Sequence, residues 1–167
     1  MYDELTEVDI KKMQEEIDHR VRVLRPQLIE EVQTARAFGD LSENFEYKCA
    51  KQAKNRNESR IRYLERMIRT AKVIEVKTQE DVVGLFDKVT IFNEMVKKEM
   101  TIQIVTTLRQ DALKGLISKE SPVGKALLGC RVGDRVLIEV SPALKYYAVI
   151  QSIEKGKDDE SLDISAY

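Results

Sequence analysis

The 167-residue chain contains no tryptophan, one histidine and two cysteines, and aromatic residues make up only 6% of it. His19 lies far along the chain from Cys49 and Cys130, which are themselves widely separated, so the spacing of a Cys/His zinc cluster is missing. The same scarcity argues against a disulfide framework and leaves no evident partner for nucleophilic catalysis by Cys49. Any chemistry must therefore use carboxylates or the site of another protein.

Long apolar runs are also missing, as are the features of a secretion signal in the opening residues. The opening residues, MYDELTEVDI, have neither a basic segment nor an apolar run, and no stretch approaches the roughly 18 apolar residues of a membrane span. The sequence therefore predicts a soluble, cytoplasmic protein with no membrane partner.

Net charge is nearly absent too, at −1 from 28 basic and 29 acidic residues, which argues against a protein that binds nucleic acid by bulk charge. The average conceals an imbalance. Residues 1–47 contain 6 basic and 12 acidic residues, whereas residues 48–76 contain 9 basic and 3 acidic ones. Either the two segments pair with each other as helices, or part of the basic segment faces solvent or a nucleic acid.

The first half of the chain has the periodicity of two long helices. The first begins at an N-cap, Thr6, with Asp9 in a capping-box position, and Pro26 predicts a kink between residues 22 and 26. Gly39 marks the turn before the second helix. Both seams repeat near every 3.5 residues, which predicts an antiparallel coiled-coil hairpin. The seams are Ile10, Met13, Ile17, Val21, Leu24, Leu28, Val32 and Ala35, then Ala50, Ala53, Asn57, Ile61, Leu64, Ile68 and Ala71.

The second half alternates apolar and polar residues in short runs, as half-buried strands do. Ser121 and Pro122 open a short helix as N-cap and first helical residue, and Gly129 ends it. We expect an α+β protein with three parts: a coiled-coil hairpin over residues 1–77, a small antiparallel β domain with one short helix over 78–155, and a fraying polar tail over 156–167.

The turn between the helices, GDLSENFEY over residues 39–47, holds three carboxylates at the point farthest from the β domain. One interpretation is helix capping, with Asp40 or Ser42 as the N-cap and with Glu43 and Glu46 favoured by the helix dipole. The other is that Asp40 and Glu43 are carried into another protein's site, where they share a Mg²⁺ ion. Two carboxylates alone do not make a tight metal site.

Two motifs in the expected order resemble the bacterial Gre family, GreA and GreB, of transcription elongation and transcript cleavage factors. GDLSENFEY, preceded by ARAF and followed by a basic helix ending RTAKVIE, looks like the family's tip signature. LISKESPVGKALLG followed by VGD resembles its C-terminal domain, which is FKBP-like. The resemblance spans nearly the whole chain.

This resemblance implies a protein that binds bacterial RNA polymerase at the coiled coil on the rim of the secondary channel and inserts its hairpin into that channel. Asp40 and Glu43 are then the catalytic acids, which help to hold a Mg²⁺ ion of the polymerase while the polymerase cleaves the backtracked 3′ end of the nascent RNA. The factor is not itself an enzyme, binds no cofactor tightly in isolation, and is expected to be a monomer.

The resemblance also assigns supporting roles. Ser42, Asn44 and Tyr47 would orient the tip or touch RNA, and the polymerase would be gripped through Glu120, Ser121 and Pro122. The basic second helix would line the extruded RNA through Lys48, Lys51, Arg56 and Arg60.

Three alternatives stay open. Phe45 stands where the family more often has a small residue, so a related protein that occupies the channel and inhibits the polymerase is the nearest. An FKBP-like prolyl isomerase with a chaperone arm requires an aromatic-lined pocket, which the scattered aromatic residues of the second half do not favour. A purely structural coiled-coil adaptor explains the seams but not the tip.

Overall fold

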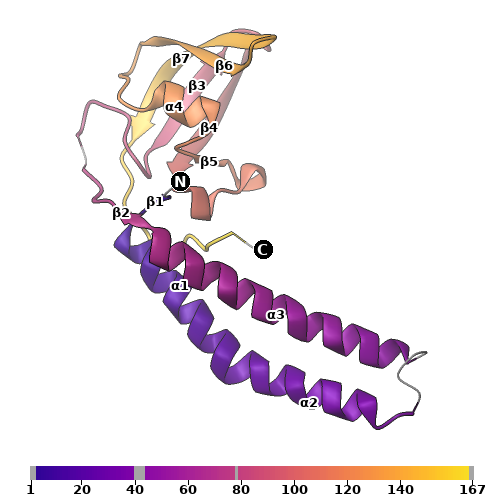
Figure 1. Cartoon of the computed structure of the whole chain (residues 1–167). Helices are drawn as coiled ribbons and strands as arrows, with labels where there is room; N and C mark the ends of the chain where they lie inside the picture. Colours follow the sequence, from indigo (N-terminus) through magenta and orange to yellow (C-terminus); the bar gives the residue numbers. More distant parts are fainter. Residues whose placement is uncertain (1–2, 40–43, 78, 166–167) are drawn as a thin grey trace. The chain divides into compact units, whose positions relative to one another are not determined.

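The computed structural model describes residues 3–39, 44–77 and 79–165 (Figure 1). These residues form two compact units. One, the body, contains residues 3–9 and 72–165; the other, the hairpin, contains residues 10–39 and 44–71. The predicted combination of a long helical hairpin and a mainly antiparallel sheet domain is confirmed. The first residues of the chain join the body, because they pair with the segment that follows the hairpin.

The hairpin consists of a first helix that is interrupted by a π-helical turn and a second helix that is continuous. The first consists of α1 (Glu7–His19), a π-helical segment (Arg20–Leu24) and α2 (Arg25–Arg36), and the second is α3 (Phe45–Thr70). The predicted capping box is present at the start of α1. The Thr6 backbone N–H donates to Asp9 Oδ2 at 3.0 Å, and the Asp9 N–H donates to Thr6 Oγ1 at 3.3 Å.

The predicted kink lies at the π-helical segment, which ends just before Pro26, and Figure 1 shows the path changing direction between α1 and α2. Proline cannot donate a backbone hydrogen bond, so the helix continues by widening for one turn. The Arg20 carbonyl then accepts from two groups: the Arg25 N–H and, at 3.2 Å, the side-chain amide of Asn57 on α3. Asn57 is buried and also accepts from Arg20 Nη1 at 3.0 Å. One α3 side chain thus satisfies the irregular turn.

Charged groups bridge the two helices on either side of this turn. Arg60 donates two hydrogen bonds to Glu16, at 2.8 and 3.1 Å, and Arg25 donates two to Glu58, at 2.7 and 3.0 Å. Burial would raise the pKa of Glu16, but hydrogen bonds from Arg60 and Arg20 outweigh it and hold that pKa below its ordinary value. Part of the opposite charge on the two segments is therefore used in pairing them.

The root of the hairpin is closed by a short parallel pair, β1 (Glu4–Leu5) with β2 (Lys72–Val73). The Lys72 N–H donates to the Asp3 carbonyl at 2.9 Å, and the Ile74 N–H donates to the Leu5 carbonyl at 2.8 Å. The segments that enter and leave the hairpin are thereby fixed side by side within the body.

Five strands form the sheet of the body in the order β5-β4-β3-β7-β6. All neighbours are antiparallel except β4 and β5, which are parallel, so the sheet is mixed at that edge. An apolar core lies on one face, where Leu127 of α4 packs with strand residues such as Ile91, Ile104, Ile138 and Ile150. The bounds are β3 (Lys88–Asn93), β4 (Lys98–Val105), β5 (Leu116–Ser118), α4 (Pro122–Leu127), β6 (Arg135–Ser141) and β7 (Leu144–Glu154).

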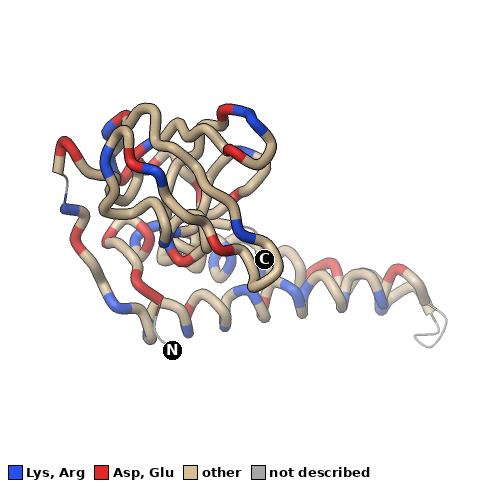
Figure 2. The backbone as a smooth tube through the Cα atoms, turned by 90° about the horizontal axis from the view of Figure 1, so that it is seen from above, with Lys and Arg blue, Asp and Glu red and all other residues tan. Residues whose placement is uncertain are grey.

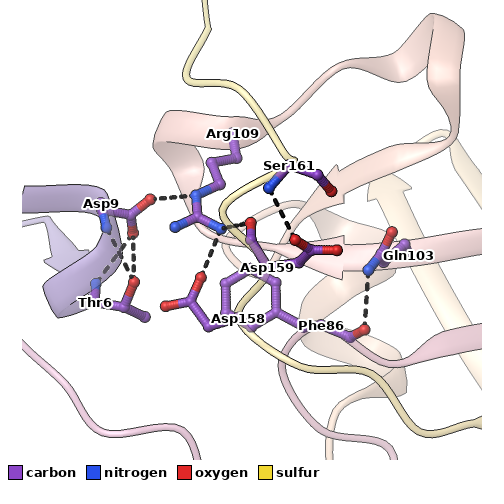
Figure 3. Close-up of polar contacts among 8 residues, drawn as sticks. All are labelled: Thr6, Asp9, Phe86, Gln103, Arg109, Asp158, Asp159 and Ser161. Carbon is purple, nitrogen blue, oxygen red and sulfur yellow. Dashed lines mark hydrogen bonds and ion pairs between the residues drawn. The ribbon is translucent and has the colours of Figure 1, made fainter. Parts of the chain in front are cut away.

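The segment after β7 does not fray as expected but is bound to the body through residue 165. Arg109, whose side chain is fully buried, donates to Asp9 Oδ1 at 2.7 Å and to the Asp159 carbonyl at 3.2 Å, and it pairs with Asp158 at 2.6 Å (Figure 3). Its guanidinium lies over the Phe86 ring. A single arginine therefore joins the first turn of α1, the body and the C-terminal segment.

Among the residues that the structure describes, no helix has both the length and the apolar character needed to cross a membrane.

We predict that Glu16→Gln lowers the free energy of unfolding by about 1–3 kcal/mol at pH 7, because the variant replaces charge-assisted hydrogen bonds with neutral ones. The folded-state pKa of Glu16 is depressed, so its contribution is present above the unfolded pKa, about 4.3, and disappears as the pH falls through the folded-state value. Chemical denaturation at pH 7 and pH 3 measures both effects.

Glu15→Gln is the matched control, since Glu15 is exposed on the same helix. Equal unfolding midpoints for the two variants at pH 7 would contradict the role given to Glu16.

Candidate functional site: the hairpin tip and the charged faces

The two helices of the hairpin are clamped together next to the tip by Asn44. Its Oδ1 accepts from the Tyr47 N–H at 3.1 Å, which makes Asn44 the N-cap of α3. Its Nδ2 donates to the Ala35 carbonyl near the end of α2 at 2.7 Å. One side chain therefore satisfies an orphan donor of one helix and a carbonyl of the other.

The carboxylates predicted to act at the tip, Asp40 and Glu43, and the supporting Ser42 lie outside the described residues, so their roles stay predictions. The capping interpretation was wrong about the residue, because Asn44 occupies the N-cap position that was expected for Asp40 or Ser42. Glu46 does lie in the first turn of α3, where the helix dipole favours a negative charge.

Tyr47, the other predicted supporting residue, contacts Arg36 at the end of α2. Arg36 Nη2 lies 3.5 Å from the Tyr47 hydroxyl, and its guanidinium lies 5.5 Å from the centre of the Tyr47 ring. The hydrogen bond and positive charge of Arg36 lower the pKa of the Tyr47 hydroxyl. Phe45, one residue after the cap, leaves 76% of its surface exposed. An aromatic side chain is therefore exposed beside the tip and available to a binding partner.

Exposed basic side chains lie along one side of α3 in two groups. Lys48 and Lys51 are near its start and Arg62, Arg66 and Arg69 are near its end, and Glu58, which pairs with Arg25, lies between the two groups. We call these five residues the basic stripe. Figure 2 shows acidic and basic positions interspersed along the hairpin as a whole. The stripe is therefore a feature of one face.

The two remaining residues predicted to face RNA behave differently. Arg56 is exposed, on a neighbouring side of α3. Arg60 is only 4% exposed and is bound to Glu16, so the prediction that it faces RNA was wrong. Arg60 pairs with Glu16 because it lies on the side of α3 that faces the first helix.

The structure brings the predicted docking residues, Glu120, Ser121 and Pro122, together at the start of α4. Ser121 Oγ accepts from the Gly124 N–H at 3.0 Å and donates to the Ser118 carbonyl at 2.6 Å, so the predicted cap is confirmed. Glu120 and Pro122 are exposed. A Cβ at Gly124 would clash with the Ser118 carbonyl, so close packing of α4 on β5 requires glycine there.

Lys119, just before these residues, reaches the root of the hairpin. Its ammonium group forms an ion pair with Glu4 of β1 and lies 3.3 Å from Glu120. Partial burial lowers the pKa of Lys119, but its hydrogen bonds to Glu4 and Glu120 outweigh that effect and raise it. The predicted docking surface is thus held in place by both β5 and β1.

Within residues 3–39, 44–77 and 79–165, no group of three or more His, Cys, Asp or Glu side chains is placed to hold a metal ion.

Family models match both halves of the chain. Residues 4–73 match "Transcription elongation factor, N-terminal", and residues 77–155 match "Transcription elongation factor, GreA/GreB, C-term". The chain belongs to the GreA/GreB family of transcription elongation factors. It is 43% identical over 137 residues to a transcription elongation factor GreA from Thermoanaerobacter pseudethanolicus, a match covering 81% of this chain and 87% of the relative. It is 39% identical over 148 residues to GreA from Rhizobium etli, covering 88% and 94%.

Solved structures of Gfh1 are also similar to this GreA/GreB-family chain. One has a TM-score of 0.45 and 26% sequence identity, covering 92% of this chain and 97% of Gfh1. The Thermus thermophilus protein, GreA factor homolog 1, has a TM-score of 0.42 at the same identity, covering 93% and 100%.

Two interactions of this family member were missed from the sequence. Asparagine is among the best N-cap residues, so Asn44 directly before a helical run was a usable signal for the clamp. Arg109 gave no such signal, because its partners lie about 100 and 50 positions away along the chain.

We predict that Asn44→Ala loosens the tip, because it removes the N-cap of α3 and the bond to α2 together, at a cost of about 1–2 kcal/mol. The Tyr47 amide should then exchange with solvent faster than in the native protein, as measured by hydrogen exchange. Asn55→Ala, at an exposed position on the same helix, is the matched control and should leave the exchange unchanged. Unaltered protection of the Tyr47 amide in Asn44→Ala would contradict the role of Asn44 as a clamp.

Proposed function

We propose that this transcription elongation factor stimulates RNA polymerase to cleave backtracked RNA, and that it has no nuclease activity of its own. The observation that carries the proposal is the acidic segment, residues 40–43, whose sequence contains Asp40 and Glu43 directly before the Asn44 clamp between α2 and α3. A two-helix rod with carboxylates in the sequence between its helices is suited to reach a site enclosed within another protein. The partners are bacterial RNA polymerase and the 3′ end of the nascent RNA.

Asp40 and Glu43 are the groups that would act at the polymerase site. They would contribute oxygen ligands to a Mg²⁺ ion shared with the polymerase, and such an ion lowers the pKa of bound water and stabilises charge on the phosphate that is attacked. Two carboxylates are too few to retain the ion in the free factor. The Asn44 clamp would limit the motion of the helix ends on which these residues are carried.

The basic stripe supplies the interaction with RNA. Five exposed cations along one side of α3 can lie against the phosphates of the extruded RNA, with a strength that falls as salt concentration rises. Arg60 is excluded from this role because Glu16 already neutralises it. Docking of the body on the rim coiled coil of the secondary channel would use Glu120, Ser121 and Pro122.

The exposure of Phe45 supports a second candidate, a factor that enters the channel and inhibits the polymerase without stimulating cleavage. A side chain that is 76% exposed two residues after Glu43 in the sequence can change how the acidic segment approaches the RNA. The isomerase alternative has less support. The cavity of about 720 Å³ in the body is lined mainly by charged and polar residues, and its one aromatic residue, Phe86, is fully buried.

We predict that the native factor accelerates RNA cleavage in a reconstituted, backtracked elongation complex with Mg²⁺, and that Asp40→Asn or Glu43→Gln reduces this stimulation by about 10²-fold or more, because ligands of the shared ion are lost. Binding to the polymerase should not change. The matched control is Glu15→Gln, which changes a carboxylate far from the tip along the chain.

Tight occupancy of the complex by the native factor without added cleavage would favour the inhibitor. Phe45→Ala would then test whether the aromatic side chain is the cause, since stimulation should appear in that variant.

We predict that Glu120→Gln and Pro122→Ala each weaken binding to the polymerase about tenfold or more, because both side chains are exposed at the docking surface. Neither change removes the Ser121 cap, so the melting temperature should stay close to that of the native factor. Glu139→Gln, at an exposed position on β6, is the control. If both variants bind the polymerase with native affinity, the docking surface does not include Glu120 and Pro122.

A further inference from the structure

A groove of about 600 Å³ lies between α2 and α3 beside the tip. Its apolar lining includes Phe38, Ala50 and Ala53, and alanines leave space because their side chains are too short to fill the gap between two helices. Phe38 is 69% exposed. A large, exposed apolar side chain and an open groove therefore lie together on the hairpin.

Three carboxylates, those of Glu30, Glu31 and Glu46, also line this groove. None of the three forms an ion pair with any residue in the described part of the chain, although other acids of the hairpin, Glu16 and Glu58, are neutralised by arginines. The groove thus combines an apolar floor with uncompensated negative charge.

The groove and the basic stripe face different ways. Glu46, Cys49, Ala50 and Ala53 line the groove, and at 3.6 residues per turn they fall on the side of α3 opposite Lys48, Lys51, Asn55 and Arg62. RNA phosphates drawn to the stripe would be repelled by the groove. The hairpin therefore has one face for a polyanion and another for a cation.

We infer that the groove receives a lysine- or arginine-bearing segment of the polymerase protein while the basic stripe faces the extruded RNA. This inference rests on the proposed entry of the hairpin into the polymerase. The negative charge of the groove disfavours nucleic acid. Its apolar floor fits the aliphatic stem of a long basic side chain, and the exposed Phe38 ring can stack with the cation at the end of that side chain. The two faces together fix which way the rod is turned about its long axis.

The chain supplies its own probe for this inference. Cys49 is exposed and lines the groove. The second cysteine, Cys130, is partly buried in the body, and burial together with nearby Asp134 raises the pKa of its thiol, which makes it less reactive. In a Cys130→Ala background, a thiol-linked photocross-linker is therefore placed in the groove without any new cysteine.

The probe is used in a reconstituted, backtracked elongation complex that contains labelled RNA. We expect Cys49 to cross-link to a polymerase polypeptide, at a peptide that contains lysine or arginine, and not to RNA. The matched probe, Asn55→Cys in a chain with both native cysteines replaced by alanine, lies next to the basic stripe and should cross-link to RNA.

Three outcomes would overturn the inference: a cross-link from Cys49 to RNA, a cross-link from Cys49 to a second copy of the factor, or none from Cys49 while Asn55→Cys reacts with RNA. The proposed function is judged separately by cleavage. A Cys49 cross-link to the polymerase without stimulated cleavage would reject that function and leave the groove assignment in place.

Charge reversal gives an independent measurement. Glu30→Lys combined with Glu31→Lys should weaken binding to the polymerase about tenfold, with the largest effect at low salt. Glu15→Lys, on the first helix outside the groove, should have little effect. Melting temperatures show whether each variant is folded. Unchanged affinity in a folded double variant would contradict the inference.

Discussion

The hairpin depends on polar contacts between its helices, because two helices alone bury only a narrow apolar seam, which includes Ile61 and Leu64. Asn57 is the centre of these contacts: its side-chain amide donates to the Arg20 carbonyl, which also accepts from the Arg25 N–H, and its Oδ1 accepts from the Arg20 guanidinium. Glu16 and Glu58 hold arginines of the opposite or the same helix on either side. These bonds add to the burial of apolar residues such as Met13, Ile61 and Leu64 in aligning the proline-containing helix with its partner.

This pairing also decides which charges are left for function. The acidic first segment and the basic second segment neutralise each other only where their side chains meet, as Glu16 and Arg60 do. Among the described residues, the charges that are not paired across the hairpin lie on its outer surfaces: a basic stripe on one side of α3, and carboxylates around an apolar groove on the other. The near-zero net charge of the chain thus hides two faces of opposite sign.

Buried polar contacts organise the body as well. The buried guanidinium of Arg109 binds Asp9, Asp158 and the Asp159 carbonyl in place of water (Figure 3). These bonds hold the start of α1 and the segment after β7 against the same side chain. A buried arginine without such partners would be strongly destabilising. The family model ends at residue 155, so part of this network comes from a segment outside the matched region.

The sequence by itself determined the two helices, the kink before Pro26, the capping box at Thr6, the short helix after Ser121 and the family, because each depends on local spacing or a contiguous motif. Only the tertiary structure decided that Asn44 clamps the tip, that β4 and β5 run parallel, that Arg60 is buried against Glu16, and that Arg109 binds residues from both ends of the chain. These depend on which side chains meet after the chain has folded back on itself. Periodicity shows that a residue faces inward or outward, but not which partner it finds there.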